Sequence, residues 1–299
     1  MREEAGVAPL EAFAPAKVNL TLRVLGRRAD GYHLIESLVA FARAGDRLEL
    51  HPGTSLGLIV HGATQSDAGP LADNLVLKAA HALIGEIPSL MTGRFMLDKQ
   101  LPVAAGIGGG SADAAAVLRL LAQLNGIALD DARVMRAAAR TGADVPVCLD
   151  PRPRVMRGIG DVLSAPVDLP PLPALLVNPR IAVPTRDVFA ALKLEPGEGE
   201  QDDAGASAQP VHSFTSLPDL LRTLAASAND LEAPAIRLHP RIGDVLKELR
   251  ALRGCQLARM SGSGATCFAL FDNPDAAEAG ARAVRAAHAD WWAVATVLS

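Results

Sequence analysis

Residues 103–116 read VAAGIGGGSADAAA, and four of the five positions from Gly106 to Gly110 are glycine. A strand-like segment at 93–99 precedes this cluster, and residues 114–124 follow it with apolar side chains at helical spacing. Glycines between a strand and a helix let backbone N–H groups turn toward one point, where the helix dipole adds partial positive charge. The cluster therefore indicates a phosphate-binding loop that joins a strand to a helix, rather than a flexible linker.

Three kinds of phosphate-binding loop carry glycines in this way. The Walker loop requires a Gly-Lys dipeptide, and the chain contains none. The dinucleotide fingerprint is matched only in part, by Gly106, Gly108 and Ser111, and the acidic residues at 130–131 lie between two expected helices rather than after a second strand. Residues 102–114 fit instead the pattern P-x-x-x-G-[LI]-G-[GS]-[GS]-S-[SA]-[DN]-A at every position.

The composition excludes several classes of protein. Of 299 residues, 49% are hydrophobic but only 3% are aromatic, which predicts a large aliphatic core. A net charge of −4 gives no basic surface for nucleic acid or an anionic membrane, and we expect neither as a partner. No apolar run reaches the ~18 residues of a membrane span, and the N-terminus lacks the apolar core of a signal peptide.

The cysteines point to a reducing compartment. Their number is odd and no two form a C-x-x-C pair, so we expect buried free thiols and a cytoplasmic protein. The three are Cys148, Cys255 and Cys267.

The hydrophobic pattern mixes strands and helices in an order that predicts an α+β fold. Alternation along residues 14–25 predicts a strand with Lys17 and Asn19 on its polar face. Further strands are expected at 47–50, 56–60, 93–99, 174–179, 255–259, 266–271 and 291–298. Helices are expected from Asp73, over 114–124, from Asp130 or Asp131 to Gly142, and over 274–288.

Between these elements we expect a turn at 28–33 (RADGYH) and an extended segment at 142–149. Residues 195–210 are acidic and almost without large apolar side chains, which predicts a mobile loop. A proline-rich passage divides the chain into an N-terminal lobe, 1–165, and a C-terminal lobe, 166–299.

The loop pattern at 102–114 resembles the ATP-binding loop of the GHMP kinases. Other segments resemble one branch of these kinases, the 4-diphosphocytidyl-2-C-methyl-D-erythritol kinase family, or the third, glycine-rich motif of the whole superfamily. They are PAKVNLTLRVLGRRADGYHLIESL (15–38), DNLVLKAA (73–80), TGADVPVCL (141–149) and, for the third motif, SGSGATCFALF (261–271). The resemblance covers roughly residues 12–299, with 195–210 as an unmatched insertion.

The resemblance implies an ATP-dependent kinase with two α+β lobes and an active site in the cleft between them. It implies phosphorylation of the 2-hydroxyl of the methylerythritol moiety in a cytidine-diphosphate substrate, a step of the non-mevalonate route to isoprenoid precursors. The expected assembly is a monomer or weak homodimer, and the expected partner is the small-molecule substrate.

Phosphoryl transfer needs a group that activates the hydroxyl and a positive charge beside it. The resemblance implies Asp144 for activation, although its residue type alone suits an Asx-turn before a proline. It implies Lys17 for the charge, although a lysine on a strand more often faces solvent. Asp113 suits activation less well, because it lies beside the phosphate loop, and Asp161 remains an alternative.

The triphosphate is expected on the backbone N–H groups of the glycine loop. The ATP-binding residues are Pro102, Val103, Ala104, Ala105, Gly106, Ile107, Gly108, Gly109, Gly110, Ser111 and Ala112. Mg²⁺ is expected with the nucleotide and usually has few protein ligands; Ser111 is a candidate, and no acidic ligand is indicated. The histidines lack the spacing of a zinc site.

The resemblance also implies the residues of the acceptor site. Tyr32 stacks on the cytosine, His33 bonds the base, and Phe189 covers the other side of the ring. Thr185 is expected to line the sugar site, and Asn19 is expected to bind the substrate. The third motif, Ser261, Gly262, Ser263 and Gly264, is expected near the phosphates or the substrate diphosphate, with a tight hairpin as the alternative.

Two other functions remain open at this point. A GHMP kinase that acts on homoserine, a sugar or mevalonate would share the superfamily motifs, and the RADGYH turn is the feature that separates them. A nucleotide-binding regulator without catalysis is the second alternative, although Lys17, Asp144 and the glycine loop are all present.

Overall fold

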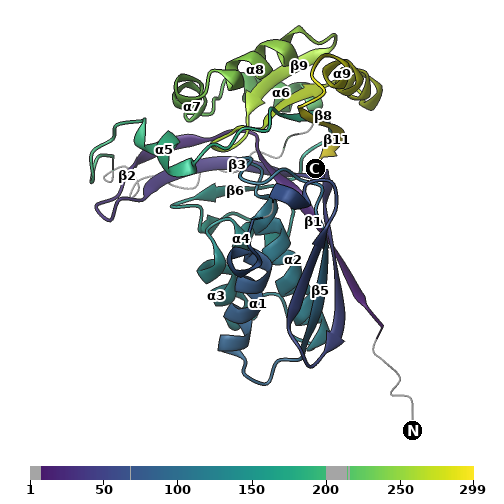
Figure 1. The fold of residues 1–299 in the computed structure, drawn as a ribbon. Coiled ribbons are helices and arrows are strands. Elements are labelled where there is room, and N and C mark those ends of the chain that lie inside the picture. The colour runs from purple at the N-terminus through teal and green to yellow at the C-terminus, as the bar shows by residue number, and fades with distance from the viewer. Residues whose placement is uncertain (1–7, 68, 200–213, 215) are drawn as a thin grey trace. The chain divides into compact units, whose positions relative to one another are not determined.

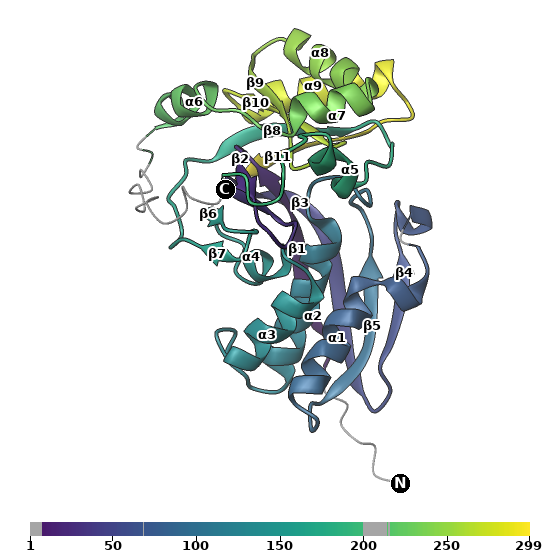
Figure 2. The same ribbon diagram turned by 90° about the vertical axis from the view of Figure 1, so that its left-hand side faces the viewer.

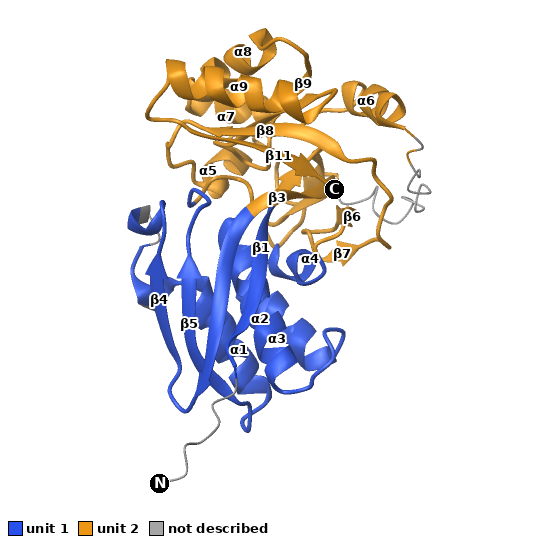
Figure 3. Cartoon of the chain, turned by 90° about the vertical axis from the view of Figure 1, so that its right-hand side faces the viewer, with its two compact units in different colours: residues 1–16, 45–103, 109–150 blue, residues 17–44, 104–108, 151–299 orange. Residues whose placement is uncertain are grey.

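The computed structural model describes residues 8–67, 69–199, 214 and 216–299, which form two compact units. Unit 1 takes its described residues from 1–16, 45–103 and 109–150, and unit 2 from 17–44, 104–108 and 151–299 (Figure 3). Two strands, β1 (Leu10–Asn19) and β3 (His33–Gly53), contribute residues to both units. Each unit is built from several separate segments of the chain, whereas each predicted lobe is one continuous segment. The lobe boundary between residues 165 and 166 stays a prediction.

Unit 1 packs four helices on one face of a sheet (Figures 1 and 2). Besides parts of β1 and β3, its elements are β4 (Gly57–His61), β5 (Thr92–Asp98), α1 (Leu75–Glu86), α2 (Gly109–Leu124), α3 (Ala132–Thr141), α4 (Val145–Leu149) and the short 3₁₀ helices Gln65–Asp67 and Leu71–Asp73. Strand β5 pairs antiparallel with β3, with Arg47 opposite Asp98, and parallel with β4. Helix α2 packs between α1 and α4.

Helix α1 has a side-chain cap at its N-terminus and a buried apolar stripe. Asn74 caps α1 by accepting a 3.0 Å hydrogen bond from the backbone N–H of Val76, so the cap lies one residue after the expected Asp73. The apolar stripe of α1 is fully buried, as its spacing predicted. It consists of Val76, Ala79, Ala80 and Leu83.

Unit 2 contains the strands β11–β8–β10–β9 in that order, with antiparallel pairing throughout. We call these four strands the second sheet, although β11 also pairs with β3 through Leu298 and Ala42. Its remaining strands are β2 (Arg23–Arg27), β6 (Arg154–Arg157), β7 (Val162–Leu163), β8 (Leu172–Asn178), β9 (Cys255–Met260), β10 (Cys267–Phe271) and β11 (Trp292–Leu298). Its helices are α5 (Thr185–Ala190), α6 (Leu217–Ala225), α7 (Glu232–Leu238), α8 (Arg241–Ala251) and α9 (Pro274–Ala287).

Helices α8 and α9 cover one face of this second sheet (Figure 1). The core between them is mainly aliphatic, as the composition predicted, and includes the buried Phe271. Leu175, Val177 and Ala269 from the strands meet Leu246 from α8. The predicted strands at 174–179, 255–259, 266–271 and 291–298 and the predicted helix at 274–288 are therefore confirmed within one or two residues.

The expected strand over residues 14–25 is wrong in its continuity. It is interrupted, because β1 ends at Asn19 and β2 begins at Arg23. Its polar face is also buried, with Lys17 and Asn19 each only 3% exposed. Alternation distinguishes the two faces of a strand but does not show that one of them meets water.

The extended segment expected at 142–149 is also wrong. Residues Val145–Leu149 form the short helix α4, and Pro146 lies in its first turn. A proline there removes an N–H group that would have no partner within the helix, so it begins the helix instead of breaking it.

Two other predictions have mixed outcomes. All three cysteines are free, with Cys148 and Cys267 buried and Cys255 half-buried. Residues 195–199 of the expected mobile loop form a turn that bonds β2, while 200–210 lie outside the described residues.

Among the described residues, no helix has both the length and the apolar character that a membrane crossing requires.

Candidate active site

The glycine loop leads into helix α2, which begins at Gly109. Its backbone is left-handed at Gly106 (φ 72°) and Gly108 (φ 62°), a region that glycine enters without steric cost. Ala104 adopts the same region at φ 51°, which is unusual for a residue with a side chain. Residues 104–108 belong to unit 2, and Gly109 and the rest of α2 belong to unit 1.

Within unit 2, the loop lies against the third glycine-rich motif. A Cβ at position 106 would lie 2.5 Å from the carbonyl oxygen of Ser261 and 2.7 Å from that of Gly264, closer than side-chain carbons approach backbone. The Ser261 hydroxyl donates a 2.9 Å hydrogen bond to the Gly106 carbonyl, and the Thr266 N–H donates to the Ala105 carbonyl at 3.0 Å. Only glycine fits at position 106.

Lys17 lies on the other side of the same loop. Its backbone N–H donates to the Ile107 carbonyl at 2.9 Å, and its Nζ donates to Oδ1 of Asn19 at 3.3 Å. The Asn19 amide donates to the Ser37 hydroxyl at 2.7 Å, and its backbone N–H donates to the Ser261 hydroxyl at 3.0 Å. Lys17, Asn19, residues 104–108 and the third motif therefore form one hydrogen-bonded arrangement.

The predicted acceptor-site residues also lie in unit 2. Tyr32 follows a turn in which the Asp30 carboxylate accepts its N–H at 3.2 Å, and its side chain is 60% exposed. The rings of His33 and Phe189 lie 4.7 Å apart between centroids. Thr185 and Ser263 share a hydroxyl hydrogen bond of 2.9 Å.

The electrostatics of His33 favour a neutral ring. Partial burial is the main effect that lowers the pKa of its imidazole, and the nearby positive charge of Arg27 lowers it further. A neutral imidazole has one donor and one acceptor nitrogen, which suits recognition of a base edge.

The carboxylates considered for activation have different surroundings. Asp144 is half-buried and directly precedes α4 in unit 1, without a side-chain cap bond to that helix. Asp161 is exposed in the turn between β6 and β7, where it accepts the N–H of Ile159 at 3.1 Å. Asp113 is buried against Lys99.

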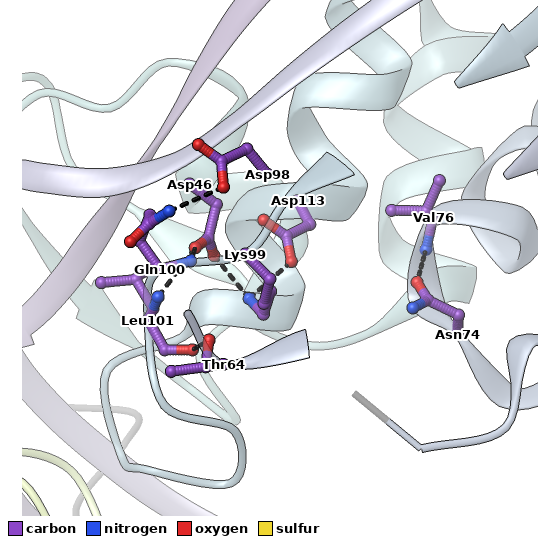
Figure 4. A network of polar contacts seen from close by, with 9 residues as sticks. All are labelled: Asp46, Thr64, Asn74, Val76, Asp98, Lys99, Gln100, Leu101 and Asp113. Atoms are coloured by element: carbon purple, nitrogen blue, oxygen red, sulfur yellow. Dashed lines mark hydrogen bonds and ion pairs between the residues drawn. The ribbon is translucent and has the colours of Figure 1, made fainter. Parts of the chain in front are cut away.

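Lys99, Asp46 and Asp113 form a buried ionic cluster in unit 1 (Figure 4). The Lys99 ammonium donates to Oδ2 of Asp46 and, at 2.7 Å, to Oδ2 of Asp113. Sequence patterns indicated neither Lys99 nor Asp46. The only local signal is a charged residue at the end of β5, directly before the loop, and another in the first turns of α2.

The described part of the chain contains no group of three His, Cys, Asp or Glu side chains arranged to hold a metal ion. Ser111 lies in the first turn of α2 and remains a candidate ligand for a nucleotide-bound Mg²⁺.

Two segments of the chain match models of the GHMP kinase family. Residues 74–150 match "GHMP kinases N terminal domain" and residues 208–290 match "GHMP kinases C terminal". The chain is 59% identical over 286 residues to the 4-diphosphocytidyl-2-C-methyl-D-erythritol kinase of Methylobacterium radiotolerans, which covers 95% of this chain and 97% of that relative.

Solved structures agree with these sequence matches. The fold is similar to the crystal structure of a 4-(cytidine 5'-diphospho)-2C-methyl-D-erythritol kinase, with a TM-score of 0.76 and 36% identity over 97% of this chain and 99% of that one. A homoserine kinase from Cytophaga hutchinsonii has a TM-score of 0.69 at 21% identity, covering 100% of this chain and 97% of that one, a likeness of fold alone.

We predict that Asp113→Asn changes the pH dependence of stability. Burial is the main cause that raises the pKa of Asp113 from 3.8 to about 8, Asp46 raises it further, and Lys99 opposes both. Between about pH 4 and pH 8 the folded protein therefore holds a proton that the unfolded chain has released, so stability falls as pH rises. Asparagine has no such proton, so the variant lacks this loss of stability with rising pH. The free energy of unfolding of the variant minus that of the parent therefore increases by up to about 1.4 kcal/mol per pH unit, and it stops increasing above about pH 8.

Urea unfolding of both proteins from about pH 6 to about pH 9 checks this. Asp131→Asn is the control, because hydrogen bonds from Arg133 lower the pKa of Asp131 to about 2, so its difference from the parent stays constant over that range. A constant difference for Asp113→Asn as well would contradict the prediction.

Proposed function

The chain belongs to the 4-diphosphocytidyl-2-C-methyl-D-erythritol kinase family of the GHMP kinases, and we propose that it phosphorylates the 2-hydroxyl of 4-(cytidine 5'-diphospho)-2-C-methyl-D-erythritol. The use of ATP follows from the family. The reaction is a step of the non-mevalonate route to isoprenoid precursors. The family and the GHMP kinase fold inferred from the motifs are confirmed.

One observation supports this function most directly. Lys17, the glycine loop and the third motif are hydrogen-bonded to one another within unit 2, in a chain that is 59% identical to a kinase of this family over nearly its whole length. The arrangement combines a buried cation with a loop whose backbone leads into a helix N-terminus. These are the parts that phosphoryl transfer requires for alignment and charge stabilisation.

We assign the phosphate-binding role to the backbone of residues 102–112. The first N–H groups of α2 have no partner within the helix, so they are available as donors to a phosphate. Bound ATP supplies the phosphoryl group, and Mg²⁺ is proposed to accompany it, with Ser111 as a candidate ligand.

We assign activation of the hydroxyl to Asp144 and charge stabilisation to Lys17. Lys17 is 3% exposed and bonded to Asn19, so its ammonium is held in one position. Asp144 belongs to unit 1 and Lys17 to unit 2, so their cooperation is part of the proposal. The cytoplasmic location and the oligomeric state also remain predictions.

A coupled ADP-release assay tests the function. With the cytidylyl substrate, homoserine and mevalonate offered separately, we expect turnover with the first alone. Turnover with homoserine or mevalonate instead would favour another GHMP kinase activity. Binding of ATP without turnover on any of the three would favour a nucleotide-binding regulator.

We predict that Asp144→Asn abolishes turnover and leaves ATP affinity within a few-fold. The amide cannot accept the proton, and loss of general-base catalysis costs roughly 100-fold or more in rate. The kcat from ADP release and the Kd for ATP from calorimetry measure the two effects. Asp161→Asn is the control, because Asp161 bonds the N–H of Ile159 within its own exposed turn, and it is expected to keep the parental rate. Near-parental turnover of Asp144→Asn would remove Asp144 from its role.

We also predict that Tyr32→Ala raises the KM for the cytidylyl substrate roughly tenfold or more, because base–aromatic stacking contributes about 1–3 kcal/mol. The side chain is 60% exposed, so its removal leaves the core intact. Tyr32→Phe keeps the stacking face and is expected to keep the parental KM. An unchanged KM for Tyr32→Ala would refute the stacking role.

A further inference from the structure

The buried cluster of Asp46, Lys99 and Asp113 lies where the chain enters and leaves the glycine loop (Figure 4). Lys99 immediately follows β5, and Asp113 is the fifth residue of α2. Asp46 is separated from Lys99 by 53 positions and belongs to β3. All three residues are at most 3% exposed, so water does not screen their interactions.

Asp46 fixes the chain where it enters the loop. Its Oδ1 accepts the backbone N–H of Gln100 at 2.6 Å and that of Leu101 at 2.8 Å, while its other oxygen accepts from Lys99. Thr64 completes the attachment, because its hydroxyl donates to the Leu101 carbonyl at 2.8 Å and its N–H donates to the Lys99 carbonyl at 3.1 Å. The residues directly before the loop are therefore bonded through backbone and side chain.

Lys99 also fixes the chain where it leaves the loop. Its ammonium bonds Asp113 on α2, and Nζ lies 3.4 Å from the position that a Cβ on Gly109 would take. The first residue of α2 thus lies directly on the buried ammonium and on the Leu101 side chain. One cation consequently contacts both ends of the loop, and only residues 102–108 lie between them.

The cluster carries no net negative charge near neutral pH, so it does not repel a polyanion such as a triphosphate. Burial raises the pKa of Asp113 to about 8, so near neutral pH this carboxyl holds a proton, and Lys99 and Asp46 balance each other. Oδ1 of Asp113 has no hydrogen-bond partner and is inaccessible to solvent. Burying these groups costs free energy that an apolar cluster would avoid.

We propose that Asp46, Lys99 and Asp113 are positioning residues for the ATP-binding loop, and that they hold its two ends at the separation at which its N–H groups converge on the triphosphate. They act through the loop and do not themselves touch ATP. The inference rests on the proposed function, because it takes residues 102–112 as the ATP site.

The test compares Asp113→Asn with the double variant Lys99→Met/Asp113→Asn. Asp113→Asn keeps an acceptor for the ammonium, so we expect its Kd for ATP to remain within about twofold of the parent. The double variant loses the cation that joins the loop ends, and we expect Kd and KM for ATP to rise roughly tenfold, with the KM for the cytidylyl substrate within about twofold. Equal rises in both KM values, or none in a folded double variant, would overturn the proposal.

Thr64→Val provides a test that does not alter buried charge. It removes one hydroxyl bond at the loop entrance, and we expect a rise of roughly fivefold in the Kd for ATP. The matched control is Thr223→Val, whose hydroxyl bonds the Asp219 carbonyl on exposed α6, and it leaves the Kd unchanged. An unchanged Kd for Thr64→Val would also overturn the proposal.

Calorimetry with ATP alone separates this inference from the proposed function. If the parent binds ATP but does not turn over the cytidylyl substrate, the proposed function fails, while the Kd values still decide the positioning role. If the parent turns over the substrate and the variants bind ATP as the parent does, only the positioning role fails.

Discussion

The contact between the glycine loop and the third motif is the constraint on which the rest of the candidate site depends. Gly106 and Ser261 are 155 positions apart, yet a single Cβ between them would collide with two backbone carbonyl groups. Because the contact is made by backbone, no rearrangement of side chains can relieve it. The approach also allows one serine hydroxyl to bond both the Gly106 carbonyl and the N–H of Asn19. Glycine at this position thus determines where Lys17 and Asn19 lie.

Backbone outside helices and sheets needs other hydrogen-bond partners for its N–H and C=O groups. Buried side chains provide those bonds in unit 2. The Arg259 guanidinium donates to the carbonyl groups of Leu20, Leu224 and Ser227, and the Asn229 amide donates to those of Met260 and Gly262. The break between β1 and β2 and the turn of the third motif are therefore supported by two buried polar residues.

The parts of the fold that follow from local physics could be predicted from the sequence. The stripe of α1, the end of α3 at Gly142 and the strands of the second sheet follow from periodicity and capping. The burial of Lys17 could not be predicted, because the segments that cover it are distant in sequence. The same holds for Lys99, whose partners are 53 and 14 positions away. Helix α4 did not follow from periodicity, because its 5 residues are too few to show a helical repeat of apolar side chains.

The fold alone does not determine the substrate, since a homoserine kinase at 21% identity has the same architecture. Specificity must then come from elements that can vary while the phosphate loop stays fixed. The turn at 28–33 has this independence, because the strand that leads into it is held by contacts with residues 194–198. Arg27 exchanges backbone hydrogen bonds of 2.7 Å with Glu198 and Gly197, and its side chain donates to the Leu194 carbonyl at 3.0 Å. Leu194 and the first residues of the insertion thus support β2, the strand that leads into the turn. A lineage can change the residues proposed to recognise the base there without disturbing the contact between the glycine loop and the third motif.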